Sequence, residues 1–249
     1  MLEPFSIAAI AATFLLAGIV KGVIGLGLPT VCLGLMTAVF DLPTAMACLL
    51  VPSFATNLWQ GVAGGNGVAI LKRLWPFLVM ATVTVWIGAL AMTRLDPKIL
   101  STLLGCLIVF HAGLGLTGFR LSISPGREVW TGPLFGAANG ILTGMTGSFV
   151  VPGVMFLQAI GLNKDILVQA MGMLFTVSTI ALALALHNNQ LLTNELGAAS
   201  ALGLIPAILG MVLGQKVRGR LSEERFRQVF FISLLALGGY IIAGALKIL

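Results

Sequence analysis

Apolar residues occur along this chain in long runs, separated by short polar connections. A helix that crosses the hydrocarbon core of a bilayer needs about 20 apolar residues. The connections carry turn-forming residues such as Asp96-Pro97 and Ser124-Pro125-Gly126. Eight runs have roughly that length or more: residues 4–40, 44–62, 74–92, 99–118, 129–160, 167–186, 196–213 and 226–246. The pattern predicts an all-α fold, a polytopic bundle of transmembrane helices.

Two of these runs are too long to be single straight helices. Residues 4–40 would reach roughly 55 Å at 1.5 Å per residue, whereas the hydrocarbon core is only about 30 Å thick. The first long run is interrupted at residues 21–29 and the second at residues 140–152, and both interruptions are dense in glycine and end on proline. We therefore expect the first segment of each half of the chain to be broken or re-entrant.

The two halves of the chain carry matching glycine patterns. Gly18-x-x-x-Gly22 corresponds to Gly136-x-x-x-Gly140, and Gly88 corresponds to Gly214. The pattern predicts two homologous halves of about four hydrophobic segments each. The expected divisions are residues 1–118 as the first transmembrane repeat, 119–128 as a connecting loop and 129–249 as the second transmembrane repeat. Gly-x-x-x-Gly spacings indicate close helix packing more often than ligand contact.

Composition excludes a soluble fold. Hydrophobic residues make up 58% of the 249 positions and charged residues only 9%, whereas a soluble domain carries roughly a quarter charged residues. The net charge is +6, and the basic residues lie in connections such as Lys72-Arg73 and residues 216–227. This placement is typical of cytoplasm-facing loops and anionic headgroups rather than of nucleic-acid binding.

The basic residues also bear on topology. The positive-inside rule is obeyed better if both long runs enter the membrane and return. The two halves would then be inverted repeats with hairpin-like broken segments. The number of crossings and the choice between parallel and inverted repeats stay open.

The two breaks are where we expect a binding site. A helix that stops inside the membrane leaves unpaired N–H groups with partial positive charge, and glycine lets a ligand approach them closely. Matching Gly/Pro breaks in two halves are typical of transporters that bind substrate near the midplane. Lys21 lies in the first break, and two interpretations stay open for it: contact with an anion, or snorkelling to the interface.

Uncharged polar residues cluster in the breaks or just after the first one. Each is either a substrate contact or a hydrogen bond between helices. The candidate substrate-binding residues are Lys21, Gly22, Gly25, Gly27, Asn57, Gln60, Asn139, Gly144, Thr146, Gly147 and Ser148.

Signatures of other chemistry are missing from the sequence. It contains no HExxH, GxSxG or P-loop motif, so we expect no enzyme. Its three cysteines have no CxxC spacing, and we expect no metal and no cofactor. Two interpretations stay open for His111, inside the fourth run: a proton relay or a hydrogen-bonded packing residue.

The glycine motifs carry a family resemblance. Residues 17–29, AGIVKGVIGLGLP, and residues 140–153, GILTGMTGSFVVPG, resemble the TauE/SafE sulfite exporter family, also called the toluene-sulfonate uptake permease family. The likeness extends over nearly the whole chain. Many members carry Gly-Gly-Gly in the first break, where this chain has Gly25-Leu26-Gly27-Leu28. We therefore expect the anion-binding turn at this break to have a different shape.

The resemblance implies a multi-pass carrier of the bacterial inner membrane. Its substrates would be sulfite, organosulfonates or related sulfur-containing anions, bound between the two broken helices. The alternatives are an anion channel and a membrane partner protein that transports nothing. The expected partners are a small anionic substrate and the lipid bilayer, without nucleic acid. Homo-oligomerisation, the particular anion, the direction of transport and the coupling ion stay open.

Overall fold

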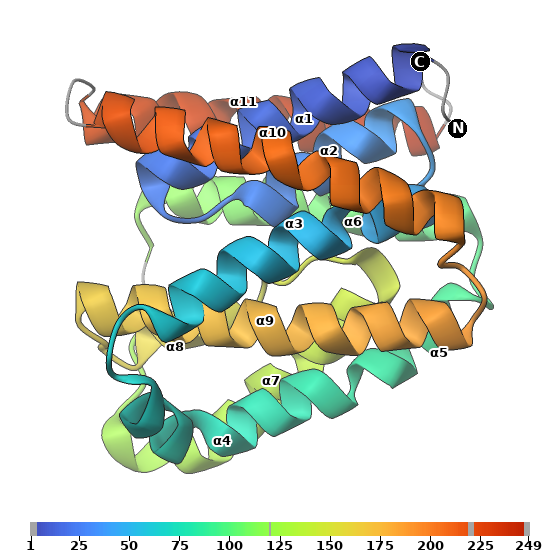
Figure 1. Ribbon diagram of the computed structural model, residues 1–249. Helices are drawn as coiled ribbons and strands as arrows, with labels where there is room; N and C mark the ends of the chain where they lie inside the picture. Colours follow the sequence, from blue (N-terminus) through green and yellow to red (C-terminus); the bar gives the residue numbers. More distant parts are fainter. Residues whose placement is uncertain (1–3, 120, 219–221, 247–249) are drawn as a thin grey trace. The chain divides into compact units, whose positions relative to one another are not determined.

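The computed structural model describes residues 4–119, 121–218 and 222–246, and this part of the chain is helical without any strand (Figure 1). The all-α prediction is therefore confirmed. The helices are α1 (Pro4–Ile24), α2 (Leu28–Val39), α3 (Leu42–Val62), α4 (Gly67–Val83), α5 (Val85–Met92), α6 (Pro97–Thr117), the short 3-10 turn η1 (Pro125–Arg127), α7 (Glu128–Thr146), α8 (Gly153–Ala159), α9 (Lys164–Asn188), α10 (Asn194–Arg218) and α11 (Glu223–Ala245).

Seven helical segments among the described residues are long and apolar enough to cross a membrane. They are α1, α3, the α4–α5 pair, α6, α9, α10 and most of α11. Two of the predicted runs, 4–40 and 129–160, each form two helices instead of one. The protein is a multi-pass membrane protein, as its hydrophobic pattern predicts.

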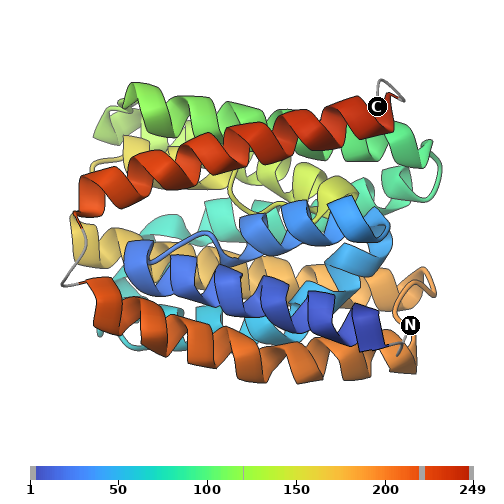
Figure 2. The same cartoon turned by 90° about the horizontal axis from the view of Figure 1, so that it is seen from above.

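Both predicted breaks are present. After α1 ends, Gly25 and Gly27 have φ angles of +87° and +109°, values that side chains with a Cβ rarely adopt. Pro29 lies in the first turn of α2, where its missing N–H is not needed, and α2 runs back beside α1 (Figures 1 and 2). In the second half, α7 ends at Gly147, with a φ of +72°, and α8 begins at Gly153. In both long apolar runs, a glycine thus follows the end of the first helix and a proline lies at the start of the second.

The described helices form two compact units. Unit 1 comprises residues 1–52, 96–118 and 191–249, and unit 2 comprises residues 53–95 and 119–190. Each unit combines segments from both expected halves of the chain. A sequence repeat and a packing unit are different divisions, so the repeat boundaries at 118 and 129 stay predictions.

In unit 1, α1 packs closely on α10. A Cβ added at Gly18 would collide with the carbonyl oxygen of Ala207, and one added at Gly210 would collide with that of Leu15. Gly22 and Gly214 face each other in the same way. The Gly-x-x-x-Gly spacing therefore brings the two backbones together, a role that small residues often have in membrane helices.

In unit 2, α7 packs on α4 and α5. A Cβ at Gly136 would meet the carbonyl of Phe77, one at Gly144 that of Val85, and one at Gly88 that of Ile141. Since Gly88 corresponds to Gly214 in the glycine pattern, both units pair the first helix of one half with the third run of the other. This repetition is what a duplicated chain with exchanged helices produces.

Pro52 lies inside α3 without ending it. Proline has no N–H, so the carbonyl of Cys48, four residues earlier, loses its helical partner. The hydroxyl of Ser200 donates to that carbonyl at 2.7 Å and accepts from the N–H of Val51 at 2.9 Å. A buried side chain of α10 thus replaces the missing hydrogen bond, which is how a membrane helix tolerates a proline.

Lys72 and Arg73 were expected in a connection, and this expectation is wrong. They lie in the second turn of α4, because the Gly64–Gly67 turn ends earlier than the apolar pattern indicates. Lys and Arg are good helix formers, so charge alone did not mark the boundary. The same expectation is wrong for most of the basic residues at 216–227: Lys216 and Arg218 lie in the last turn of α10, and Arg225 and Arg227 lie in α11. Arg220 lies outside the described residues.

Arg73 makes hydrogen bonds to both ends of the broken α7–α8 segment, at Glu128 and Ile160. Its guanidinium donates to both carboxylate oxygens of Glu128, at 2.7 and 3.0 Å, and to the carbonyl of Ile160 at 3.2 Å. We expect Arg73→Ala to lower the melting temperature by a few degrees, because a partly exposed pair contributes up to about 1 kcal/mol. Thermal unfolding in detergent measures this, with Lys72→Ala, at an exposed neighbouring position, as control. Equal melting temperatures of the two variants would contradict the role of Arg73.

Candidate functional site

The first break places a buried cation beside an irregular turn of unit 1. Lys21 lies in the last turn of α1 with 5% of its surface exposed, and among the described residues no other charged side chain is buried. A cation is favoured there because the C-terminal end of a helix carries partial negative charge. The backbone carbonyl of Lys21 accepts a hydrogen bond from the N–H of Gly25 at 2.7 Å, and this bond lies at the end of α1. Lys21, Gly25 and Gly27 therefore lie in one short turn, and substrate contact by them stays a prediction.

The turn leads directly into the amino-terminal end of α2. Gly27 caps this helix and has no side chain to accept from its first N–H groups. Thr30, in the first turn, is buried, and its Oγ1 atom has no hydrogen-bond partner within the described part of the chain. We call a buried side-chain N or O atom of this kind an open polar atom. A buried polar group without a partner is costly, so an open polar atom marks a place where a ligand can bind.

The second break is spanned by one side chain of unit 2. Asn139, on α7, is fully buried, and its Oδ1 accepts from the N–H of Gly153 at 2.9 Å. This hydrogen bond links α7 to the first residue of α8 and fixes which amide atom is the oxygen. The other end of the amide, Nδ2, is an open polar atom. Asn139 thus holds an NH₂ donor in a fixed orientation inside the protein.

The backbone of the second break is held by local hydrogen bonds. Thr143 donates from its hydroxyl to the carbonyl of Ser148 at 3.0 Å. Thr146 donates to the carbonyl of Leu142 at 2.7 Å and accepts from the N–H of Ser148 at 3.3 Å. The Thr146 hydroxyl is therefore engaged in shaping the turn, and Gly147 provides the left-handed conformation that the turn needs.

Ser178 was not among the residues predicted for the site. It is fully buried on α9, and its Oγ is an open polar atom. Leu174, one turn earlier on the same face of α9, packs at Gly153, beside the Asn139 amide. The sequence shows Ser178 only as one of many hydroxyl residues in an apolar run, so no local pattern distinguishes it.

Of the two predicted polar residues on α3, Asn57 makes a hydrogen bond within that helix and Gln60 makes one to α9. Asn57 is fully buried and donates to the hydroxyl of Ser53 at 2.9 Å, and Ser53 lies 3.4 Å from the hydroxyl of Thr179 on α9. Gln60 donates to the carbonyl of Val168 at 2.8 Å. The Ser53–Thr179 and Gln60–Val168 contacts join α3 to α9, which is the commoner role of such residues in membranes. Substrate contact by Asn57 and Gln60 stays a prediction.

Two predicted glycines have a packing role. Gly22 faces the backbone of α10, and Gly144 faces the backbone of α5. Their missing side chains are therefore needed for helix contact, and substrate binding at either residue stays a prediction. The expectation that both broken helices enclose one site also stays a prediction, since each unit is described by itself.

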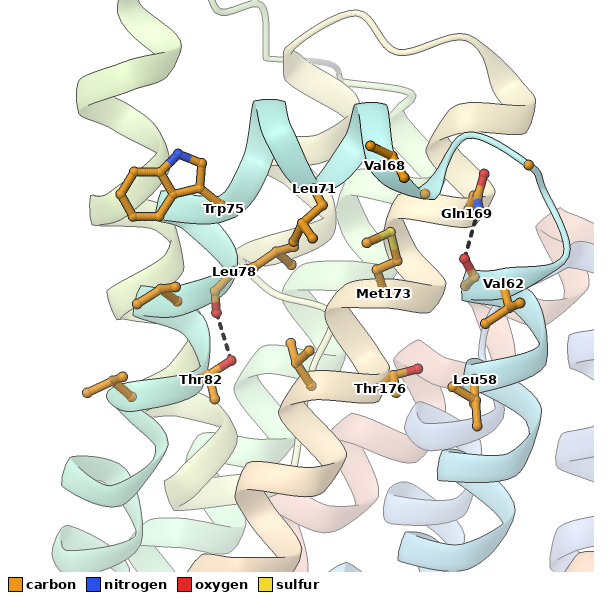
Figure 3. A pocket seen from close by; sticks show the side chains of 16 residues that line it. Leu58, Val62, Val68, Leu71, Trp75, Leu78, Thr82, Gln169, Met173 and Thr176 are labelled. Atoms are coloured by element: carbon orange, nitrogen blue, oxygen red, sulfur yellow. Dashed lines mark hydrogen bonds between the residues drawn. The ribbon is translucent and has the colours of Figure 1, made fainter.

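Unit 2 also contains an apolar groove of about 700 Å³ formed by α3, α4 and α9 (Figure 3). Its polar side chains already have partners: Gln169 donates to the carbonyl of Gly61, Thr176 to that of Gly172, and Thr82 to that of Leu78. An anion would find only hydrocarbon and occupied polar groups there. The groove is thus less suited to an anion than either break, despite its size.

No group of three or more His, Cys, Asp or Glu side chains lies close enough together to hold a metal ion, as far as the described residues extend. The polar atoms at the breaks are a lysine, an amide NH₂, hydroxyl groups and helix amides. They can donate hydrogen bonds to an oxyanion, and the lysine adds a positive charge.

Helices that break within long apolar segments, with buried donors at each break, are typical of membrane transporters. The family model described as sulfite exporter TauE/SafE matches residues 10–241 of the chain. The chain therefore belongs to the TauE/SafE family, whose members are exporter-type membrane transporters of sulfite and other anions. No curated protein and no solved structure matched the chain.

Proposed function

We propose that the protein is a secondary carrier of small anions in the bacterial inner membrane. Its substrates are sulfite, organosulfonates or related sulfur-containing anions, bound at the two helix breaks. It moves these anions without chemical change and is not an enzyme. Family membership supports the transporter class, and the groups at the breaks support the sign of the substrate's charge.

The observation that carries this proposal is the Asn139 amide. Its oxygen is held by the N–H of Gly153, so its NH₂ group cannot turn around to accept a hydrogen bond. The donor is fully buried and is an open polar atom. Leaving such a group without a partner costs about 1–3 kcal/mol, which a bound oxyanion recovers. Ser178 provides a second donor of the same kind in unit 2.

The first break contributes charge in unit 1. Lys21 is buried there. Three residues separate the end of α1 from the start of α2, and no side chain caps the first amide groups of α2. The partial positive charge of a helix amino terminus adds to that of the ammonium group. An anion is therefore the ligand that both features favour.

We expect Asn139→Asp to lower anion transport about 10- to 100-fold, since a hydrogen bond to a charged group contributes about 1.5–3 kcal/mol. The carboxylate keeps the size of the amide and can still accept from Gly153, but it removes the NH₂ donor and adds a negative charge. Uptake of labelled sulfite and of an alkylsulfonate into proteoliposomes measures the effect. Asn163→Asp is the matched control, because Asn163 is an exposed cap of α9 and Asp caps equally well.

Wild-type transport by Asn139→Asp would remove the Asn139 amide from the site. If this variant fails to fold, Ser178→Ala gives the independent reading, since it removes only one oxygen atom. We expect its apparent affinity to be roughly ten-fold weaker, and an unchanged affinity would contradict a role for α9 in binding.

Kinetics separate the carrier from its alternatives. A carrier shows saturable uptake that is stimulated by substrate on the opposite side, whereas a channel shows flux that does not saturate and no such stimulation. Absence of flux for sulfite, thiosulfate, alkylsulfonates and short carboxylates would favour a non-transporting membrane partner. A thermal-shift screen with the same anions tests binding directly, because a ligand stabilises the folded state by mass action.

A further inference from the structure

His111 is an ionisable residue within the membrane that the proposed anion site does not use. It lies in α6, and its Nε2 is an open polar atom. Its ring meets the ring of Phe231 edge-on, with centroids 5.5 Å apart and planes at 77°. Ionisable residues inside membrane helices are rare, and those present frequently carry protons or ions. The position of the imidazole relative to the first break therefore bears on what it can do.

The glycine contacts of unit 1 give the directions of α2, α6 and α11. On α2, Gly27 contacts Phe230 of α11, and Gly34 contacts Leu237, so these two helices run in the same direction. On α6, Gly105 contacts Ile242 of α11 and Gly115 contacts Phe231, so α6 runs the opposite way. Figure 2 shows α11, in red, crossing beside α6, in green.

This arrangement places His111 at the level of the first break. A Cβ at Gly27 would lie 3.2 Å from the Phe230 ring, and the next residue, Phe231, contacts the His111 ring. The two phenylalanine rings lie 5.1 Å apart. Between Gly27 and Gly34 on α2 lies Thr30, whose Oγ1 is also an open polar atom. The start of α2 and the imidazole are thus neighbours through one pair of aromatic side chains.

The other charged and titratable side chains on the helices around His111 are few. On α6 they are Lys98 and Cys106, both exposed, and on α2 there is the buried Cys32. On α11 the described ones are Glu224, Arg225, Arg227 and Tyr240, all exposed. Within the described side chains of these helices, no carboxylate lies beside the imidazole to balance a proton on it. A bound anion at the break would provide that negative charge.

We propose that His111 couples anion movement to proton movement. This inference rests on the proposed anion site. On one side of the membrane a hydronium ion transfers its proton to Nε2 as the anion binds, and on the other side the N–H proton passes to a water molecule as the anion leaves. One proton then accompanies each anion in the same direction. The bound pair is neutral for a monovalent anion, which lowers the cost of burying either charge.

The test uses purified protein in proteoliposomes with ethanesulfonate as the probe, because a sulfonate stays ionised at every pH used. Two quantities are measured: exchange of labelled ethanesulfonate at equal pH, and its accumulation driven by an acidic outside. We expect His111→Gln to keep exchange within about twofold of wild type and to lose accumulation. His187→Gln, at the exposed end of α9, should keep both, which makes it the matched control.

Accumulation by His111→Gln equal to that of His187→Gln would overturn the inference. Loss of both activities in folded His111→Gln and His111→Asn would also overturn it, because His111 would then belong to the anion site. If neither variant folds, an internal pH dye in wild-type vesicles decides: acidification with ethanesulfonate entry supports coupling, and its absence refutes it. Failure of the proposed function looks different, since wild type would then exchange no anion at all.

Discussion

Replacing Lys21 with methionine should abolish anion transport and leave the membrane fold intact. Lys21 is the buried cation of the first break, and its ammonium group is the full positive charge that unit 1 offers an anion there. Methionine is unbranched and of similar length to lysine, and it buries no charge, whose desolvation is costly. We therefore expect transport at background level together with an unchanged or higher melting temperature.

The measurement is sulfite and alkylsulfonate exchange in proteoliposomes, paired with thermal unfolding in detergent. Lys72→Met is the matched control, since Lys72 is exposed on α4, and it should transport at the wild-type rate. Exchange by Lys21→Met at a rate near that of wild type would remove Lys21 from the site. Partial recovery in Lys21→Arg, which restores the charge with a different shape, would show that the charge is what matters.

Replacing Gly18 with leucine should prevent α1 from packing on α10. Even a Cβ at Gly18 would collide with the Ala207 carbonyl oxygen and lie 3.0 Å from the N atom of Met211. Both atoms belong to a helix backbone, which cannot move aside as a flexible side chain could. Overpacked cores typically lose about 1–3 kcal/mol, and this contact should reach ~3 kcal/mol or more.

The fraction of monodisperse protein after detergent extraction, and its melting temperature, measure the effect. Gly113→Leu is the control: Gly113 is also a helix residue, in α6, but a Cβ there meets no atom within 4 Å. It should behave as wild type, because leucine favours helix more than glycine does. Similar melting temperatures for the two variants would mean that α1 and α10 do not need their close approach.

The contrast between Lys21 and Gly18 reflects two roles within one sequence motif. Gly18 and Gly22 face α10, while Lys21, between them in sequence, is buried at the break. The equivalent motif in the second half places Gly136 and Gly140 against α4, and Asn139 spans the second break. When Gly18-x-x-x-Gly22 is aligned with Gly136-x-x-x-Gly140, Asn139 occupies the position of Lys21. In each half a polar residue therefore precedes the second glycine of the packing motif.

Several parts of the site could not be predicted from the sequence. Ser178 looks like Ser53 or Thr179, yet Ser53 and Thr179 lie within hydrogen-bond distance of each other and Ser178 Oγ is an open polar atom. Gly144 looks like Gly147, yet Gly144 packs on α5 and Gly147 forms the turn. Whether a polar group finds a partner depends on residues more than a hundred positions away, as with Ser53 and Thr179.

The sequence by itself determined the class of protein and the places where its helices break. The length of an apolar run sets whether it can span a bilayer, and clustered glycines interrupt a helix through their own backbone geometry. Both are local properties, so they could be read without a structure. Helix boundaries at charged residues were less secure, as Lys72 and Arg73 show, because lysine and arginine are compatible with both helix and loop.

Only the tertiary structure decided which helices pair and which buried polar atoms are open. The pairing of α1 with α10 and of α7 with α4 and α5 depends on surfaces that match across the whole chain. The open polar atoms of Thr30, Thr37, His111, Asn139 and Ser178 can be identified only once the hydrogen-bond partners of the other buried groups are known. The physical reason is that a hydrogen bond or a close backbone contact needs two groups that meet in space. In this chain such groups are often far apart in the sequence, so no local pattern shows which ones meet.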